Sequence, residues 1–558
     1  MRRYCGTTKG QHLGGEAIGG LKGQFVPERA SVAVLAVACL AHYWICSSLS
    51  SEIALDVDPI NLVYGMREFN IAHYAPHPPG YLVYVWMLRA LHAVVGGTPL
   101  GTVQLLARVL STLTIPLVFM AVTTLRPTDP VARGYAAVLT AFHPFLIYHA
   151  VDAQTHTSEA FAAALLLLAL VHYLGRPTII WAAAMGAALA LGSAFRPSFV
   201  VAGIGPIIWA IGFRRIAHLS VAGISSLLGA FSWMMPTFQA SGGFAQWRAA
   251  NDALIQQTIV RTSSPFSDQA IAGFVAFNMR STALWLLLAL APAFVAMLSR
   301  LGSAAPPDPA YTRARSIAFW SAGPAVLFYL AMFCSEPGYL LGFVPAIIAV
   351  TALAASPKLS HARRRFALIA ALATQLGILM LPPASSQVAK VPSVPELVRR
   401  EVLYRTVFER MRDELPRGAR ALYVSDYQDV VLSRQLPVLS PNVHSLVYHR
   451  EYEPPYQQTS ISFATADDWI PIPGPILLQP GPPSVQAMPY TYDFIVVDPI
   501  ASADLRNELS RASSCDLRVP EGAVDVLVVP AERCFPEGVI ASHGRGIRFS
   551  LAATPDPG

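Results

Sequence analysis

Long apolar blocks alternate with short polar segments over the first two thirds of the chain. From about residue 31 to about residue 382, these blocks approach the roughly 20 residues that an α-helix needs to cross a bilayer. This part is therefore expected to be a polytopic α-helical membrane protein. The blocks predict about eleven membrane helices, at 31–49, 103–125, 134–151, 158–175, 177–195, 197–213, 216–236, 282–299, 316–334, 339–355 and 366–382.

The pattern changes after residue 382. Short β-branched runs at 421–427, 493–498 and 524–530 are typical of strands, and they alternate with helical and Pro-rich segments. We expect a small α/β domain there, with the Pro-rich stretch 467–483 as a linker or an extended surface arm. The chain thus divides into an N-terminal segment 1–30, a transmembrane domain 31–382 and a soluble C-terminal domain 383–558.

Composition agrees with the membrane assignment. Of the 558 residues, 54% are hydrophobic and 13% charged, whereas soluble domains carry roughly 25% charged residues. Mean hydropathy is +0.45. Residues 1–30 lack the apolar core of a cleavable signal peptide, so the first span is expected to remain attached.

The distribution of basic residues predicts the orientation. The net charge is +6, and most Lys and Arg lie in short connections between spans. If 80–97, which contains Arg89 and His92, lies along the outer leaflet as an amphipathic interfacial helix, these connections share one side, which the positive-inside rule assigns to the cytoplasm. We therefore expect a multi-pass protein of the plasma (inner) membrane, with a cytoplasmic N-terminus, an extracytoplasmic C-terminal domain and no nucleic-acid partner.

This topology places the stretch 55–81 on the outer side, directly after the first span. Asp56 and Asp58 form a D-x-D arrangement that could share a divalent cation, or one carboxylate could act as a base for an attacking hydroxyl. The alternative is that the pair caps a helix that begins near Pro59. Further along, the two prolines and the glycine of His77-Pro78-Pro79-Gly80 stiffen a turn, which would hold His77 near the aspartates.

A second group of polar residues is expected on the same side. Arg196 lies between two apolar runs, against the positive-inside bias, so it either binds an anion such as a phosphate or snorkels at a helix end. Arg248, Arg261 and Arg280 belong to the long outer loop expected at about 237–281 and could add to an anion site. Asp152, His156 and Glu159 of the short outer loop 152–159 could complete the site, although each alone is more typical of a solvated loop.

Cysteines give one further indication. Cys515 and Cys534 lie in the C-terminal domain, where an oxidising outer compartment would favour pairing, although two free thiols are an equal alternative. Cys39, Cys46 and Cys334 fall in or beside predicted membrane helices and are expected to be packing residues.

Together, the outer Asp, the Pro-Pro turn, the outer Arg and the stretch PGYLLGFVPAIIAV (337–350) resemble the C-type (GT-C) membrane glycosyltransferases. The resemblance covers roughly residues 31–382. It is greatest to the protein O-mannosyltransferase and lipid A aminoarabinose transferase group, in a bacterial branch with Asp followed by His-Pro-Pro-Gly-Tyr, here Asp58 and His77. The later Gly-Tyr-Leu-Leu run, which contains Tyr339, adds to it.

The resemblance implies the roles of individual residues. Asp58 looks like the essential acidic residue of the first outer loop, with Asp56 as a second candidate. His77 is similar in position to a Lys that helps hold the donor phosphate, Arg196 resembles a basic residue at the outer end of the fifth span, and Tyr339 resembles a tyrosine near the site. Many relatives have Asp-Glu where this chain has Asp58-Pro59, so the resemblance leaves metal binding by Asp56 and Asp58 open.

The function implied is transfer of a sugar from a polyprenyl-phosphate donor to an acceptor hydroxyl on a protein, a glycolipid or a polysaccharide. No cofactor is certain, and a divalent cation is the one candidate. Two other classes stay open at this point. A lipid or sugar transporter would have a similar number of spans, and a membrane scaffold would only display the C-terminal domain.

Overall fold

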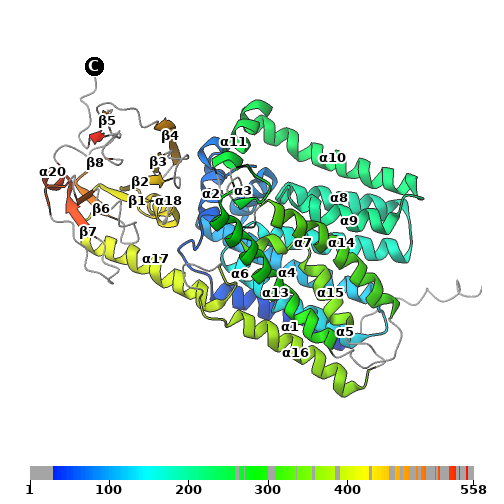
Figure 1. Cartoon of the computed structure of the whole chain (residues 1–558). Coiled ribbons are helices and arrows are strands. Elements are labelled where there is room, and N and C mark those ends of the chain that lie inside the picture. The colour runs from blue at the N-terminus through cyan, green and yellow to red at the C-terminus, as the bar shows by residue number, and fades with distance from the viewer. Residues whose placement is uncertain are drawn as a thin grey trace, which may run out of the picture.

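The computed structural model shows a bundle of long helices joined to a C-terminal region that contains the strands (Figure 1). Its described residues are 29–257, 263–268, 270–298, 308–332, 334, 336–354, 359–383, 390–426, 430–450, 459–464, 469–476, 485–487, 492–497, 509–510, 513–515, 527–535, 539–540 and 548–550. The helices of the bundle are α1 Arg29–Ser48, α2 Val57–Arg67, η1 Ile71–His73, α3 Leu82–Val95, α4 Pro99–Leu125, α5 Pro130–Ala141, α6 Pro144–Val151, α7 His156–Gly175, α8 Ile179–Phe195, α9 Phe199–Ile211, α10 Ile216–Ala240, α11 Phe244–Gln257, α13 Ala272–Leu298, α14 Pro309–Ala331, η2 Pro337–Leu340, α15 Val344–Ala354 and α16 His361–Leu379.

Each of the eleven predicted spans falls on helix in this bundle. Five helices of the described chain, α1, α4, α7, α10 and α13, are individually long and apolar enough to cross a membrane, and α5 with α6 adds a sixth when this pair, bent by 40°, is counted as one span. The helices α8, α9 and α15 are apolar but shorter. The protein is therefore a multi-pass helical membrane protein.

Local sequence fixes where several helices begin. Thr98 caps α4, since its Oγ1 accepts a hydrogen bond from Gly101 N at 3.1 Å, and Pro99 occupies the first helical turn. Asp129 caps α5 in the same way, accepting from Ala132 N at 3.0 Å. Such caps satisfy the free N–H groups that begin each helix.

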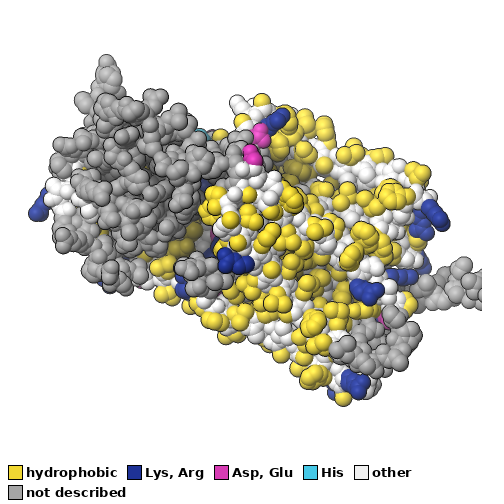
Figure 2. Space-filling view, in the orientation of Figure 1, with side chains coloured by type: hydrophobic (Ala, Val, Ile, Leu, Met, Phe, Trp, Pro, Cys, Tyr) yellow, Lys and Arg dark blue, Asp and Glu magenta, His cyan; other side chains and the backbone are white. Residues whose placement is uncertain are grey.

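The order of the helices along the chain shows which segments lie at the same end of the bundle. Most of the long helices follow one another through short connections and alternate in direction, while the longer connections α1–α4 and α10–α13 contain the short helices α2, α3 and α11. The residues that follow α1, α6, α8, α14 and α16 therefore gather at one end, and those that follow α4, α7, α9, α13 and α15 gather at the other. Figure 2 shows several Lys and Arg side chains at the end far from the strands and an apolar flank between the ends.

One expectation about the outer segments needed revision. The segment 237–281 is largely helical rather than a long loop, because α10 runs to Ala240, α11 spans Phe244–Gln257 and α13 already starts at Ala272. The predicted interfacial helix is α3, whose 14 residues extend about 21 Å at 1.5 Å per residue, too short for a bilayer core of about 30 Å. Arg89 of α3 donates to Met66 O and Gly65 O at 3.0 and 2.9 Å, so it satisfies carbonyls at the end of α2.

The C-terminal region follows α17 and forms two sheets. Its elements are α17 Val394–Glu414, β1 Ala421–Asp426, α18 Val430–Leu439, β2 Val443–Arg450, β3 Thr459–Ala464, β4 Trp469–Ile476, β5 Val485–Ala487, β6 Phe494–Val497, β7 Leu527–Pro530, α20 Ala531–Cys534, β8 Val539–Ile540 and β9 Arg548–Ser550. The larger sheet has the order β4-β3-β2-β1-β6-β7, with β1 parallel to both β2 and β6, and the smaller has the order β5-β9-β8. The predicted strands at 421–427, 493–498 and 524–530 correspond to β1, β6 and β7.

The predicted linker 467–483 was wrong for its first half. Residues Trp469–Ile476 form β4, which pairs antiparallel with β3 at the edge of the larger sheet. Proline cannot donate to a strand ladder, and an edge strand tolerates it because one side has no partner strand. Residues 477–483 lie outside the described part of the chain.

The C-terminal domain packs directly on the bundle. Leu397 of α17 belongs to the same apolar cluster as Cys46, Leu55 and Tyr148 of the helix bundle. Cys515 and Cys534 form a disulfide, which decides between the two readings of these cysteines. Cys46 and Cys334 are buried, as expected of packing residues.

Candidate functional site

The first outer segment presents Asp58 next to His77. Nε2 of His77 lies 3.0 Å from Oδ1 of Asp58, and both side chains are about one-fifth exposed (20% and 22%). The second ring nitrogen, Nδ1, lies 2.6 Å from Pro78 O. Because both nitrogens face oxygen acceptors, the arrangement favours the imidazolium form. Burial alone would lower the pKa of His77, but the charge and hydrogen bond of Asp58 raise it above its ordinary value.

The turn after His77 is shaped by local sequence. Gly80 has a φ of +112°, and a Cβ there would lie 3.0 Å from Cζ of Phe69. The Tyr81 ring stacks edge-on against His77 with centroids 5.0 Å apart. Trp247 of α11 donates from Nε1 to Pro79 O at 3.1 Å, so α11 also supports the turn.

Asp56 has a different environment. Its Oδ1 accepts from Asp58 N at 3.4 Å and caps α2, so the capping alternative applies to Asp56. Its Oδ2 lies 2.8 Å from Lys390 Nζ and 3.8 Å from Arg400 Nη1. Burial would raise the pKa of Asp56, but these two cations hold it well below its ordinary value. A divalent cation on Asp56 would have to displace both.

Lys390 joins Asp56 to a further acidic residue. Its Nζ also pairs with Oε1 of Glu336, directly before η2. Burial raises the pKa of Glu336 to about 7, although Lys390 opposes this shift. The linker between bundle and C-terminal domain thus contributes a cation to the site. Lys390 lies outside any motif, and Glu336 has only its place in an outer turn as a signal, so sequence reasoning missed both.

A buried group lies around Arg196, at the end of α8. Nη1 of Arg196 lies 3.2 Å from Thr155 Oγ1 and 3.3 Å from His156 Nε2, and Nε lies 3.6 Å from Glu159 Oε2. The Arg196 guanidinium stacks over the Tyr339 ring, 4.5 Å from its centroid. The structure therefore brings together Arg196, His156, Glu159 and Tyr339, which come from three separate parts of the sequence.

The expectation that Asp152, His156 and Glu159 are singly solvated was wrong. All three are at most 1% exposed. Oδ2 of Asp152 accepts from Gln154 Nε2 at 3.0 Å, and burial raises the pKa of Asp152 well above its ordinary value. The first turn of α7 therefore packs inside the bundle, because η2 covers it, as the close approach of Gly338 to the His156 ring indicates.

Two of the three candidate arginines of 237–281 lie away from this group. Arg248 pairs with Asp252 on α11 at 3.4 Å, with a side chain 68% exposed. Arg280 is exposed on α13 and bonds to Ala276 O of its own helix. Arg261 lies outside the described residues.

Helix α18 of the C-terminal domain forms hydrogen bonds with residues 54–74, the segment that contains Asp56 and Asp58. Gln435 forms two hydrogen bonds with the backbone of Ala54, accepting from Ala54 N at 3.0 Å and donating to Ala54 O at 3.3 Å. Arg434 donates to His73 O and Tyr74 O at 3.0 and 3.2 Å. The carbonyl of Arg434 accepts from Tyr64 Oη at 3.0 Å. These contacts could not be read from the sequence, since the partners lie more than 350 positions apart.

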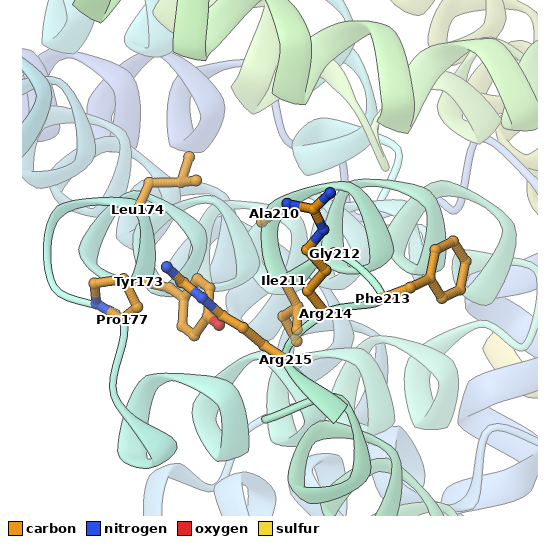
Figure 3. A pocket seen from close by; sticks show the side chains of 9 residues that line it. All are labelled: Tyr173, Leu174, Pro177, Ala210, Ile211, Gly212, Phe213, Arg214 and Arg215. Atoms are coloured by element: carbon orange, nitrogen blue, oxygen red, sulfur yellow. The ribbon is translucent and has the colours of Figure 1, made fainter. Parts of the chain in front are cut away.

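A cavity of about 620 Å³ lies at the opposite end of the bundle. The α7–α8 and α9–α10 connections line it; Arg215 lies over the Tyr173 ring, whereas Arg214 points away from it (Figure 3). Arg126, Asp129, Asp308 and Arg364 form an ion-pair network at this same end. Since Asp58 and Arg196 are at the other end, we do not assign this cavity to the candidate site.

Comparison with known proteins gives matches in structure alone. No protein-family model and no curated protein matches the chain. Among solved structures, it is similar to ArnT from Cupriavidus metallidurans bound to undecaprenyl phosphate, with 12% identity over 75% of this chain and 93% of that one, at a TM-score of 0.49. It is similar to the oligosaccharyltransferase of Archaeoglobus fulgidus, with 14% identity over 73% and 63% of the two chains, at a TM-score of 0.38. A third similar structure is the arabinosyltransferase EmbB from Mycobacterium smegmatis, with 15% identity over 72% and 39%, at a TM-score of 0.42.

Proposed function

We propose that the chain is a membrane glycosyltransferase that moves a sugar from a polyprenyl-phosphate donor to an acceptor hydroxyl. The observation that carries this proposal is the contact between Asp58 and His77. It sets a carboxylate beside a titratable cation at one end of a membrane bundle. Transfer from a sugar phosphate needs a base for the acceptor proton and positive charge for the departing phosphate.

Asp58 supplies the base. His77 contacts Oδ1, and we assign the proton transfer to Oδ2. The acceptor oxygen attacks the anomeric carbon, its proton passes to Asp58, and the bond between the anomeric carbon and the phosphate oxygen breaks with its electron pair on the phosphate. Attack from the face opposite the phosphate inverts the anomeric centre. Such a proton-transfer group typically contributes about 10²–10⁴-fold in rate.

His77 and Arg196 supply the positive charge. Both ring nitrogens of His77 already contact oxygens, so we assign to His77, whose pKa is raised, an attraction of its positive charge for the phosphate rather than a hydrogen bond. Arg196 is 6% exposed and enclosed by Glu159 and Tyr339. We assign to Arg196 a fixed positive charge behind the phosphate, with Tyr339 keeping the guanidinium in place.

The short apolar helix α3 is proposed to lie in the outer leaflet, where it would border the entry of the lipid chain. The orientation has two supports. The arginine network lies at the end assigned to the cytoplasm, and the disulfide Cys515–Cys534 is typical of an oxidising compartment. The site would then open to the extracytoplasmic side, where protein, glycolipid or polysaccharide hydroxyls are the acceptors.

The test uses full-length protein purified in detergent or lipid nanodiscs. Short-chain polyprenyl phosphates carrying labelled hexoses or pentoses are offered with membrane acceptors, with and without chelator. The proposal expects transfer from at least one donor, with an inverted anomeric centre in the product. Absence of both transfer and donor binding across the donor panel would contradict it.

A further inference from the structure

Three side chains with metal-binding atoms meet behind the candidate site. His149 belongs to the last turn of α6, His156 begins α7, and Glu336 precedes η2. One ligand atom from each lies within 4.8 Å of the other two. Two imidazoles and one carboxylate are a donor set that zinc sites use with a fourth, open position.

Several of these atoms lack a hydrogen-bond partner among the described residues. His149 is 0% exposed; the Gln154 side chain approaches its ring, but neither ring nitrogen makes a hydrogen bond of good geometry. Oε2 of Glu336 is also unpaired, and the Glu336 side chain is 13% exposed. Leaving buried polar atoms without a partner destabilises a fold, so such a group calls for a ligand.

Neighbouring residues orient the other two side chains toward each other. Lys390 occupies Oε1 of Glu336, so Oε2 is the oxygen that faces Nε2 of His156, at 3.9 Å. Two ligands of a tetrahedral zinc ion lie about 3.4 Å apart, given bond lengths of about 2.0–2.2 Å. A closure of about 0.5 Å would therefore bring these two atoms to the separation that a shared zinc ion needs.

A carboxylate also lies behind His156. Oε2 of Glu159 is 3.8 Å from Nδ1 of His156, on the side of the ring away from Glu336. This is the place at which metal-bound histidines usually have an orienting carboxylate. The His149 and His156 rings lie 4.7 Å apart between centroids, so both imidazoles face the same space.

One group competes for the same atom. Nη1 of Arg196 lies 3.3 Å from Nε2 of His156, so a metal ion on that nitrogen would replace this contact. Arg196 would keep Thr155, Glu159 and Tyr339 as its partners. Binding of a metal ion and the contact between Arg196 and His156 should therefore exclude each other.

We propose that His149, His156 and Glu336 bind one divalent transition-metal ion of the zinc class. The ion would tie the α6–α7 turn to η2 behind the Asp58 pair. The proposal differs from a metal site on Asp56 and Asp58, and it does not depend on the sugar-transfer reaction.

The test measures metal binding by full-length protein. The purified protein is stripped with chelator and titrated with Co²⁺, whose visible absorption reports tetrahedral ligation, and bound metal per chain is determined by elemental analysis. Wild type should take up one equivalent, and Zn²⁺ should raise its thermal unfolding midpoint. His149→Gln should weaken Co²⁺ binding by at least the order of 10- to 100-fold that loss of an outer-shell partner alone costs. The matched control is His172→Gln, at the other end of α7, where the imidazole stacks on Trp181, and this variant should bind as wild type does.

Glu336→Gln provides the second variant, because it keeps the side-chain length and an oxygen for Lys390. It decides the question if His149→Gln does not fold, and it should also lose the Co²⁺ signal. Wild type with no stoichiometric metal and no Co²⁺ absorption would overturn the proposal. Unchanged binding by a folded variant of either ligand would overturn it equally.

Discussion

His77 and Asp58 form a contact of 3.0 Å between Nε2 and Oδ1, which joins a titratable cation to the carboxylate that we assign as the base. The contact connects two features that lie nineteen positions apart in the sequence, the D-x-D segment and the Pro-Pro turn. On the proposed function, both the stability and the activity of the protein should depend on the charge on His77.

The first prediction concerns pH and stability. The folded-state pKa of His77 is raised above the ordinary value of about 6.5. The ion pair therefore stabilises the fold fully below about pH 6.5, and this contribution is lost as pH rises through the raised pKa. Thermal unfolding followed as pH rises from below the unfolded-state pKa of His77 should show a loss in wild type that Asp58→Asn lacks. Parallel curves for the two proteins would contradict this coupling.

A second prediction concerns the charge that holds the phosphate. Transfer by wild type should decline as His77 loses its proton, whereas His77→Lys should keep transferring at higher pH, because a lysine pKa is about 10.4. His77→Ala should lose transfer across the range. The pH–rate profiles of the three proteins check this. A profile for His77→Lys that declines at the same pH as wild type would assign the titration to another group.

Lys390 should be important for stability. Removing its ammonium leaves the carboxylates of Asp56 and Glu336 without their shared cation. Lys390→Met should therefore destabilise the fold. An unpaired buried polar group costs about 1–3 kcal/mol, and we expect the lower part of that range because the Lys390 side chain is one-third exposed. Denaturant unfolding measures this effect. Adding Glu336→Gln to Lys390→Met should recover part of the loss, and strict additivity of the two changes would exclude their coupling.

The sequence predicted the parts of the fold that depend on local pattern. Apolar blocks of near-bilayer length became the helices of the bundle, and β-branched runs became β1, β6 and β7. The strand within 467–483 was missed because its prolines were taken as evidence for a linker or surface arm despite its β-branched residues. An edge strand tolerates proline. The helical content of 237–281 was missed for a related reason, since its polar residues are typical of loops when no neighbouring helix is known.

The candidate site was predictable only in part. Asp58, His77, Arg196 and Tyr339 each had a motif or an unexpected charge to mark them. His149, Lys390 and Gln435 had none, and Glu336 had only its place in an outer turn, because their roles arise from contacts between distant segments. Burial of Asp152, His156 and Glu159 was also beyond local pattern, since it results from the packing of η2 over the start of α7.

The two hydrogen bonds from Gln435 of the C-terminal domain to Ala54, here called the Gln435 clamp, give the next prediction. Gln435→Leu removes both hydrogen bonds to Ala54, two positions before Asp56, and leaves buried backbone groups unpaired. We expect faster amide exchange at residues 53–58 and a reduction in transfer rate of about tenfold, since misplacement of a base by an ångström is costly. Gln239→Leu on the exposed side of α10 is the control. Unchanged exchange and rate in Gln435→Leu would remove the Gln435 clamp from the account.

Orientation is tested through the disulfide. Cys515 and Cys534 should resist a membrane-impermeant thiol reagent on intact cells, and they should react with it after mild external reduction. Cys39→Ser, Cys46→Ser and Cys334→Ser remove the three free cysteines of the described chain and limit the background. Labelling of 515 and 534 that requires permeabilised membranes would place the C-terminal domain on the opposite side.

The central claim is that Asp58 is the base of a glycosyl transfer, and the most direct measurement compares purified Asp58→Asn with wild type in single-turnover transfer from the active polyprenyl-phosphate donor. The account predicts a loss of about 10²–10⁴-fold in the transfer step with donor binding retained. Asp252→Asn, the same change on the exposed face of α11, should transfer normally. A rate for Asp58→Asn within a few-fold of wild type would contradict the claim.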